Sequence, residues 1–171
     1  MLIEAGGKEL LMASQNGHAE ALRVLIEAGG KGLVMLTDDE GRSCAHEASQ
    51  NGHAEALRVL IEAGGTELLM LTDNDGWSCA YIASENGHVE ALRMLIEVGG
   101  KELAMLTDDE GTSCAFIASR NGHVDALRVL IEAGGKELLM LTVNNNGASC
   151  AYVAAQKGQT EVLKMLVEVG G

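Results

Sequence analysis

The stretch SCAYIASENGH, residues 78–88, occurs in four closely related forms along the chain. It reads SCAHEASQNGH at 43–53, SCAFIASRNGH at 113–123 and SCAYVAAQKGQ at 149–159. The cysteines Cys44, Cys79, Cys114 and Cys150 are therefore 35, 35 and 36 residues apart. A period of this length is typical of stacked-repeat architectures, so it predicts a repeat array before any site is considered. The extra residue falls in VNNNG, 143–147, where a loop tip tolerates insertion.

Length and charge bound the possible functions. The chain has 171 residues, enough for one domain or one continuous array, and 25 acidic residues against 12 basic ones. This balance argues against a nucleic-acid partner, because phosphate binding needs a basic surface. No apolar run approaches the ~20 residues that cross a bilayer, and no secretory signal precedes the repeats. We therefore expect no membrane association and an intracellular, cytoplasmic location.

One repeat, residues 73–107, reads DNDGWSCAYIASENGHVEALRMLIEVGGKELAMLT. DNDG predicts a tight turn, and Ser78 is placed to cap a helix over CAYIASE. Asn-Gly at 86–87 ends that helix, because glycine adopts the left-handed conformation at a helix end. A second helix follows over VEALRMLIEV, with apolar residues at i, i+3 and i+4, and Gly-Gly at 99–100 ends it. KELAMLT is expected to add one short helical turn before the next hairpin.

These residues resemble the ankyrin repeat. Ser43, Cys44, Ala45 and His46 occupy the family's Thr-Pro-Leu-His positions, and Gly52-His53 its Gly-His pair. The match recurs through nearly the whole chain, although cysteine replaces proline throughout and the connector is about two residues longer than usual. The resemblance implies an all-α, ankyrin-type solenoid of stacked helix-turn-helix repeats with hairpin-like turns between them.

The whole chain, 1–171, is then a single ankyrin-repeat domain. We place a cap half-repeat and connector at 1–37, full repeats at 38–72, 73–107 and 108–142, and a C-terminal repeat at 143–171. Within the cap, KELLMASQN forms the first helix. Residues 1–6 resemble the end of a preceding second helix and are expected to be a disordered remnant of a longer array or of an excised fragment.

The repeated cysteines and histidines are interpreted as architecture. Equivalent positions in neighbouring repeats lie about 8–10 Å apart, too far for a disulfide or a shared zinc ion. The cysteines are expected to be small, half-buried packing residues, and His18, His53, His88 and His123 to bridge turns. A thiol at the first helical position could instead have a lowered pKa and be reactive, which stays open as an alternative. No metal, cofactor or catalytic residue is predicted.

Positions that differ between repeats give the candidate binding residues. In the family, hairpin tips and the exposed side of the first helix form a concave binding surface, and aromatic residues dominate binding hot spots. The predicted protein-binding residues are Asp39, Glu40, Arg42, Gln50, Asn74, Asp75, Trp77, Tyr81, Glu85, Asp109, Glu110, Thr112, Phe116, Arg120 and Gln156. The alternative for Trp77 is packing over a neighbouring hairpin. The alternative for Tyr81, Phe116 and Tyr152, at the family's structural histidine position, is packing between repeats.

Glu47 is unusual, because its counterparts Ile82, Ile117 and Val153 are apolar and a buried charge needs a partner. His46 or Arg42 could supply that partner, or the first full repeat is looser at this position.

The resulting prediction is a non-catalytic protein–protein interaction scaffold, with a partner of basic character held on the concave face. It is expected to be monomeric, with end-to-end self-association as an option for its apolar terminal repeats. Alternatives are an engineered or excised array with no evolved partner, a self-associating structural solenoid, and an enzyme that uses cysteine or histidine. No convergent set of side chains motivates the last of these.

Overall fold

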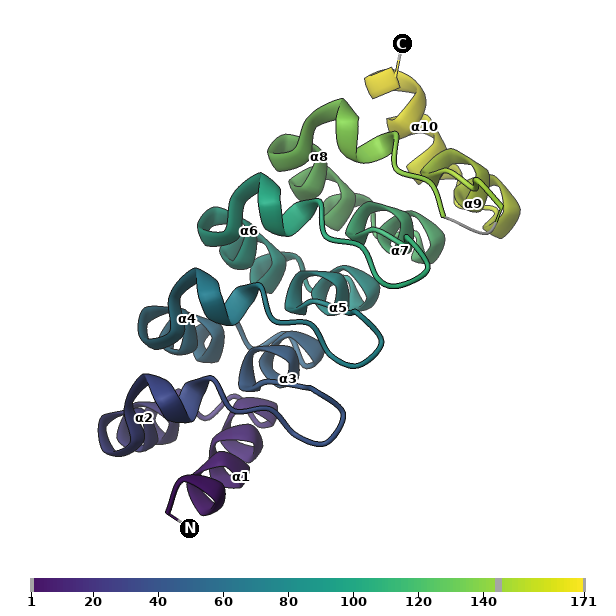
Figure 1. Ribbon diagram of the computed structural model, residues 1–171. Helices are drawn as coiled ribbons and strands as arrows, with labels where there is room; N and C mark the ends of the chain where they lie inside the picture. Colours follow the sequence, from purple (N-terminus) through teal and green to yellow (C-terminus); the bar gives the residue numbers. More distant parts are fainter. Residues whose placement is uncertain (1, 144–145, 171) are drawn as a thin grey trace.

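The computed structural model describes residues 2–143 and 146–170, and the side chains of 6–143 and 146–170. These residues form ten α-helices arranged in two stacked rows (Figure 1). The helices are α1 (Leu2–Gln15), α2 (Ala19–Val34), α3 (Cys44–Gln50), α4 (Ala54–Leu69), α5 (Cys79–Asn86), α6 (Val89–Ala104), α7 (Cys114–Asn121), α8 (Val124–Leu139), α9 (Cys150–Lys157) and α10 (Thr160–Gly170). The predicted all-α solenoid is confirmed.

The short helices α5, α7 and α9 begin and end as the sequence predicts, whereas in α3 Ser43 Oγ faces Nδ1 of His46 and the helix ends at Gln50. Ser78 Oγ accepts a hydrogen bond from the backbone N–H of Tyr81 at 3.1 Å, so it caps α5. Ser113 and Ser149 cap α7 and α9 in the same way. Gly87 ends α5 in the left-handed conformation, with φ 70° and ψ 26°.

The second helix of each repeat is interrupted near its C-terminal end. Gly100, at φ 59° and ψ −155°, leaves the helical region inside α6. Glycine tolerates this backbone conformation because it has no Cβ. The residues after Gly100 form one further turn, as predicted, and Gly30, Gly65 and Gly135 repeat the same break in α2, α4 and α8.

Hairpins join the repeats. Isolated antiparallel bridges pair Thr37 with Ser43, Thr72 with Ser78 and Thr107 with Ser113. Inside the middle hairpin, Asp73 Oδ1 accepts hydrogen bonds from the backbone N–H groups of Asp75 and Trp77. Asp38 and Asp108 make the equivalent bonds in their own hairpins, so the first acid of these three loops holds its turn. The insertion predicted in VNNNG includes residues 144–145, which lie outside the described residues.

The core runs the length of the stack between the two rows of helices. Short helices α1, α3, α5, α7 and α9 pack on one another in sequence, as do the long helices α2, α4, α6 and α8 (Figure 1). Leu57, Leu92 and Leu127, at equivalent positions of successive repeats, are 0% exposed. Each repeat thus buries its apolar faces against its neighbours, as expected for a solenoid.

The N-terminus differs from the expectation. Residues 2–6 do not form a disordered remnant but continue α1, which runs unbroken from Leu2 to Gln15. Gly6 and Gly7 allow α1 to lie close to the last turn of α2 and the residues after it, because a Cβ would come 3.3 Å from Leu33 Cδ1 at Gly6 and 3.1 Å from Leu36 Cδ1 at Gly7. Leu10, only 2% exposed, fills the core position that Ala80 occupies in the second full repeat.

None of the helices in the described part of the chain combines the length and apolar character that a membrane span requires.

Candidate functional site

The hairpin tips and the neighbouring surface of the short helices form the candidate site. We call it the hairpin face and define it by the tips 39–40, 74–75 and 109–110 and by Arg42, Trp77, Glu85 and Arg120. Figure 1 shows the hairpins that precede α3, α5 and α7 projecting side by side from one edge of the stack. The residues of the hairpin face therefore come from successive repeats that are held in fixed register.

The tips present a row of acidic side chains. Asp39, Glu40, Asp75, Asp109 and Glu110 are all exposed. The first two tips are also joined, because Asn74 donates from its backbone N–H to the Glu40 carbonyl and from Nδ2 to the Asp39 carbonyl, both at 3.0 Å. These bonds fix the spacing between the tips, so the negative charge is held on an ordered frame.

Trp77 and Tyr81 form one stacked pair beside the tips. Their ring centroids lie 5.2 Å apart with an interplanar angle of 17°. Trp77 is partly exposed, whereas Tyr81 is 5% exposed. Burial raises the pKa of Tyr81, and the nearby carboxylates Asp108 and Glu85 raise it further against the opposing effect of Arg120. Trp77 is therefore the surface member of the pair and Tyr81 its buried support.

Two other predicted contact residues are also buried. Thr112 is 6% exposed and Phe116 is 9% exposed. Tyr152, at the position equivalent to Phe116 in the last described repeat, is 57% exposed. The side chain at this position is therefore covered wherever a following repeat is present. Tyr81, Thr112 and Phe116 offer a partner little surface, so we leave them out of the proposed contact set.

The remaining predicted residues divide between exposed and engaged groups. The side chains of Arg120 and Gln156 are exposed, and those of Gln50 and Glu85 are partly buried. Gln50 Nε2 donates to Asn86 Oδ1 at 3.5 Å, so its amide is already linked to the next repeat. Arg120 is the one basic side chain of this set whose head is not paired in the described residues.

Arg42 supplies the partner that Glu47 needs. Its Nη2 lies 3.2 Å from Glu47 Oε1. Burial raises the pKa of Glu47, while Arg42 lowers it and the carboxylates Asp38 and Glu40 raise it. The predicted Arg42–Glu47 pair is thus present, and it removes Arg42 from the groups most free to meet a partner.

The cysteines are less reactive than one of our interpretations allowed. Burial raises the pKa of the Cys44, Cys79 and Cys114 thiols to about 12, and it raises the pKa of Cys150 as well. All four are free and fully buried, not half-buried as expected. The suggestion of a lowered thiol pKa is therefore wrong, because loss of hydration outweighs the effect of the helix start.

His53, His88 and His123 reach from the turn of their own repeat to the end of the preceding short helix, so they bridge neighbouring repeats. Nε2 of His53 lies 3.0 Å from the Gln15 carbonyl oxygen, and His88 and His123 make the same contact with Gln50 and Glu85. Gln159 replaces histidine in the last repeat and donates to the Arg120 carbonyl at 3.0 Å. Within the described residues no cluster of histidine, cysteine and carboxylate side chains could hold a metal ion.

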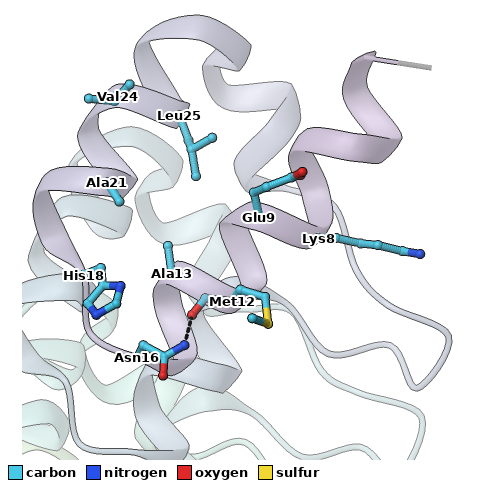
Figure 2. Close-up of a pocket in the computed structure, with 9 residues that line it drawn as sticks. All are labelled: Lys8, Glu9, Met12, Ala13, Asn16, His18, Ala21, Val24 and Leu25. Atoms are coloured by element: carbon cyan, nitrogen blue, oxygen red, sulfur yellow. Dashed lines mark hydrogen bonds between the residues drawn. The ribbon is translucent and has the colours of Figure 1, made fainter.

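An apolar hollow at the N-terminal end was not among the predicted sites. It lies between α1 and α2 and is lined by Lys8, Glu9, Met12, Ala13, Asn16, His18, Ala21, Val24 and Leu25 (Figure 2). The sequence could have indicated this hollow. Met12 aligns with Ile82 and Ile117, which are buried, but no repeat precedes Met12 within the described residues to cover it.

Comparison with known proteins agrees with this architecture. The family model described as ankyrin repeats (3 copies) matches residues 10–105 and 99–171. A search among curated proteins gave no match.

Proposed function

Because the chain belongs to the ankyrin-repeat family, whose members are generally protein–protein interaction modules, we propose that it is a non-catalytic scaffold whose hairpin face binds a protein with basic character. The observation that carries this proposal is the row of exposed carboxylates at the tips, set beside the partly exposed ring of Trp77. Acidic groups of this kind attract and orient a positively charged partner, while an aromatic ring supplies apolar contact area.

The rigidity of the hairpin face favours binding. Its tips are fixed by the internal bonds of Asp73 and Asp108 and by the bonds from Asn74 to the preceding hairpin. A partner therefore does not have to order these loops, and less conformational entropy is lost on association. The net charge of −13 adds a long-range attraction for basic proteins, which weakens as salt is added.

The cysteines support a reducing compartment. Four buried free thiols are typical of proteins in the cytoplasm, where disulfides rarely persist, so we infer a cytoplasmic location.

The test compares two variants that lose the same amount of charge. One carries Asp39→Asn, Asp75→Asn and Asp109→Asn at the tips. The matched control carries Glu27→Gln, Glu62→Gln and Glu132→Gln, which neutralise exposed carboxylates on the long helices. Proteins captured from lysate by the parent should be retained by the control and lost by the tip variant, and they should be released as salt is raised.

Trp77→Ala should reduce the same capture, because it removes the aromatic contact and leaves the charge unchanged. Equal losses from the tip variant and its control would indicate a response to net charge alone and would contradict binding at the hairpin face. Full retention by the tip variant and by Trp77→Ala would contradict it as well.

A further inference from the structure

The two ends of the stack expose the apolar positions that the inner repeats bury. At the N-terminal end Met12 is 61% exposed, whereas its counterparts Ile82 and Ile117 are 1% and 0% exposed. Val24 is 67% exposed, whereas Val59, its counterpart in the next repeat, is 4% exposed. With Ala21 and Leu25 these residues line the hollow in Figure 2, and we call them the N-terminal end face.

The other end shows the complementary pattern. Tyr152 is 57% exposed, against 5% and 9% for its counterparts Tyr81 and Phe116. Val167 is 72% exposed, whereas the equivalent Ile96 is 8% exposed. Leu163 adds a partly exposed side chain, and we call Tyr152, Leu163 and Val167 the C-terminal end face.

These two faces are the two halves of one interface that the chain already forms between its repeats. Val153, which occupies the position of Ile82 in the last described repeat, is still only 3% exposed. Side chains at this position therefore face the preceding repeat. Tyr152, which occupies the position of Tyr81 in the last described repeat, is exposed, whereas Tyr81 and Phe116 are buried. Side chains at this position therefore face the following repeat. The C-terminal end face of one molecule thus has the composition that packs against an N-terminal end face.

We propose that a second copy of this chain docks head to tail, with its N-terminal end face on the C-terminal end face of the first. The occupant is argued from continuity, because the docked copy extends the stack by the packing of α7 on α9 and α6 on α8. A heterologous contact of this kind leaves a free face at each end, so it builds open chains. This inference is independent of the function proposed for the hairpin face.

Polar groups at the two ends match two contacts found between described repeats: an ion pair at one junction and a histidine contact at three. Arg23 Nη2 lies 3.1 Å from Glu55 Oε1 of the next repeat. In a docked pair Lys164, at the position of Arg23, faces Glu20 of the second copy, at the position of Glu55. Likewise, His18 of the second copy takes the place of His53 and reaches the Gln156 carbonyl, as His53 reaches that of Gln15.

Salt separates this contact from binding at the hairpin face. Each copy carries a net charge of −13, so two copies repel each other and screening by salt strengthens their association. Capture of a basic partner responds in the opposite direction. The two proposals can therefore fail separately.

The experiment measures the mass of the purified chain by sedimentation velocity over a wide range of protein concentrations. One variant carries Met12→Glu and Val24→Glu on the N-terminal end face, and a second carries Tyr152→Glu and Val167→Glu on the C-terminal end face. The matched control carries Thr66→Glu and Val98→Glu, which add the same two charges at exposed side chains of inner repeats. All substituted side chains are exposed, and circular dichroism checks that each variant folds.

The parent and the control should rise in mass above the 17.9 kDa monomer with concentration and with salt. Each end-face variant alone should stay monomeric. A mixture of the two should form a 1:1 dimer and nothing larger, because only one intact pair of faces is left. A parent that stays monomeric throughout, or an end-face variant that dimerises alone, would overturn the proposal.

Discussion

Nε2 of His46 lies 2.9 Å from the carbonyl oxygen of Trp77, which belongs to the next repeat. Nδ1 of the same ring accepts a hydrogen bond from the backbone N–H of Ser43, so Nε2 carries the proton and donates it to Trp77. His46 therefore caps its own helix and ties the first full repeat to the hairpin beside the candidate site. Only the Nδ1 contact requires the neutral ring, because a protonated ring still donates from Nε2 but cannot accept at Nδ1.

The neutral ring predicts a loss of stability in acid. Burial lowers the pKa of His46 from its ordinary value of 6.5, although the Trp77 carbonyl and Asp73 oppose the change. Below pH 6.5 the unfolded chain thus binds a proton that the folded chain does not. The stability due to the neutral ring is therefore present above pH 6.5 and is lost as pH falls toward the folded pKa, by at most about 1.4 kcal/mol per pH unit.

His46→Phe isolates this effect, because Phe116 occupies the same position in a later repeat. Urea unfolding of both proteins at several pH values should give a smaller slope of unfolding free energy against pH for the variant between pH 7 and pH 5. The other four histidines are common to both proteins and drop out of the difference. Identical slopes would show that His46 does not carry this pH dependence.

Glu47→Ile should stabilise the fold. Ile82 and Ile117 fill the same position in the inner repeats, and a hollow lined by Lys8, Leu11 and Met12 borders Glu47. The substitution removes a half-buried carboxylate and adds apolar contact, which together raise the unfolding free energy by about 0.5–2 kcal/mol. Thermal unfolding should show a higher Tm. An unchanged or lower Tm would mean that the pair with Arg42 outweighs the gain.

The thiols should react only when the fold opens. With pKa values of about 12 for Cys44, Cys79 and Cys114, the thiolate fraction at pH 8 is on the order of one in ten thousand. Cys150 lies in the last described repeat, beside the exposed Tyr152, and terminal repeats open most readily. Pulsed alkylation read by mass spectrometry should therefore label Cys150 first. Immediate labelling of an inner cysteine without denaturant would contradict this order.

Most of the fold followed from the repeat itself. The caps at Ser78 and Ser113, the stop at Gly87 and the break at Gly100 depend on local backbone chemistry, which a sequence displays directly. The exposure of a side chain depends instead on what lies next to it. Tyr81 and Tyr152 share one motif, yet their exposed fractions are 5% and 57% because only Tyr81 is covered by a following repeat.

The candidate site was harder to predict for the same reason. Variation between repeats identified Trp77 and the acidic tips, but it could not separate exposed positions from Thr112 and Phe116, which are buried. The N-terminal hollow arises where α1 combines a connector with a short helix and omits the hairpin. Its apolar lining appears only once the stack is assembled.

A pair of glycines tests how strongly one repeat constrains the next. Gly87 and Gly158 end equivalent helices with nearly the same backbone angles, φ 70° and ψ 26° against φ 72° and ψ 25°. A Cβ on Gly87 would lie 2.5 Å from Nδ1 of His123, whereas a Cβ on Gly158 meets no atom within 4 Å.

Alanine in the left-handed conformation costs about 1–2 kcal/mol at either position. Gly87→Ala must also displace His123 from the Glu85 carbonyl, so urea unfolding should show a larger loss than for Gly158→Ala. Repeating both substitutions in a His123→Ala background should bring the two losses together, because the clashing ring is gone. Equal losses in the parent background would mean that the ring yields freely and that the histidine contacts hold the repeats together only weakly.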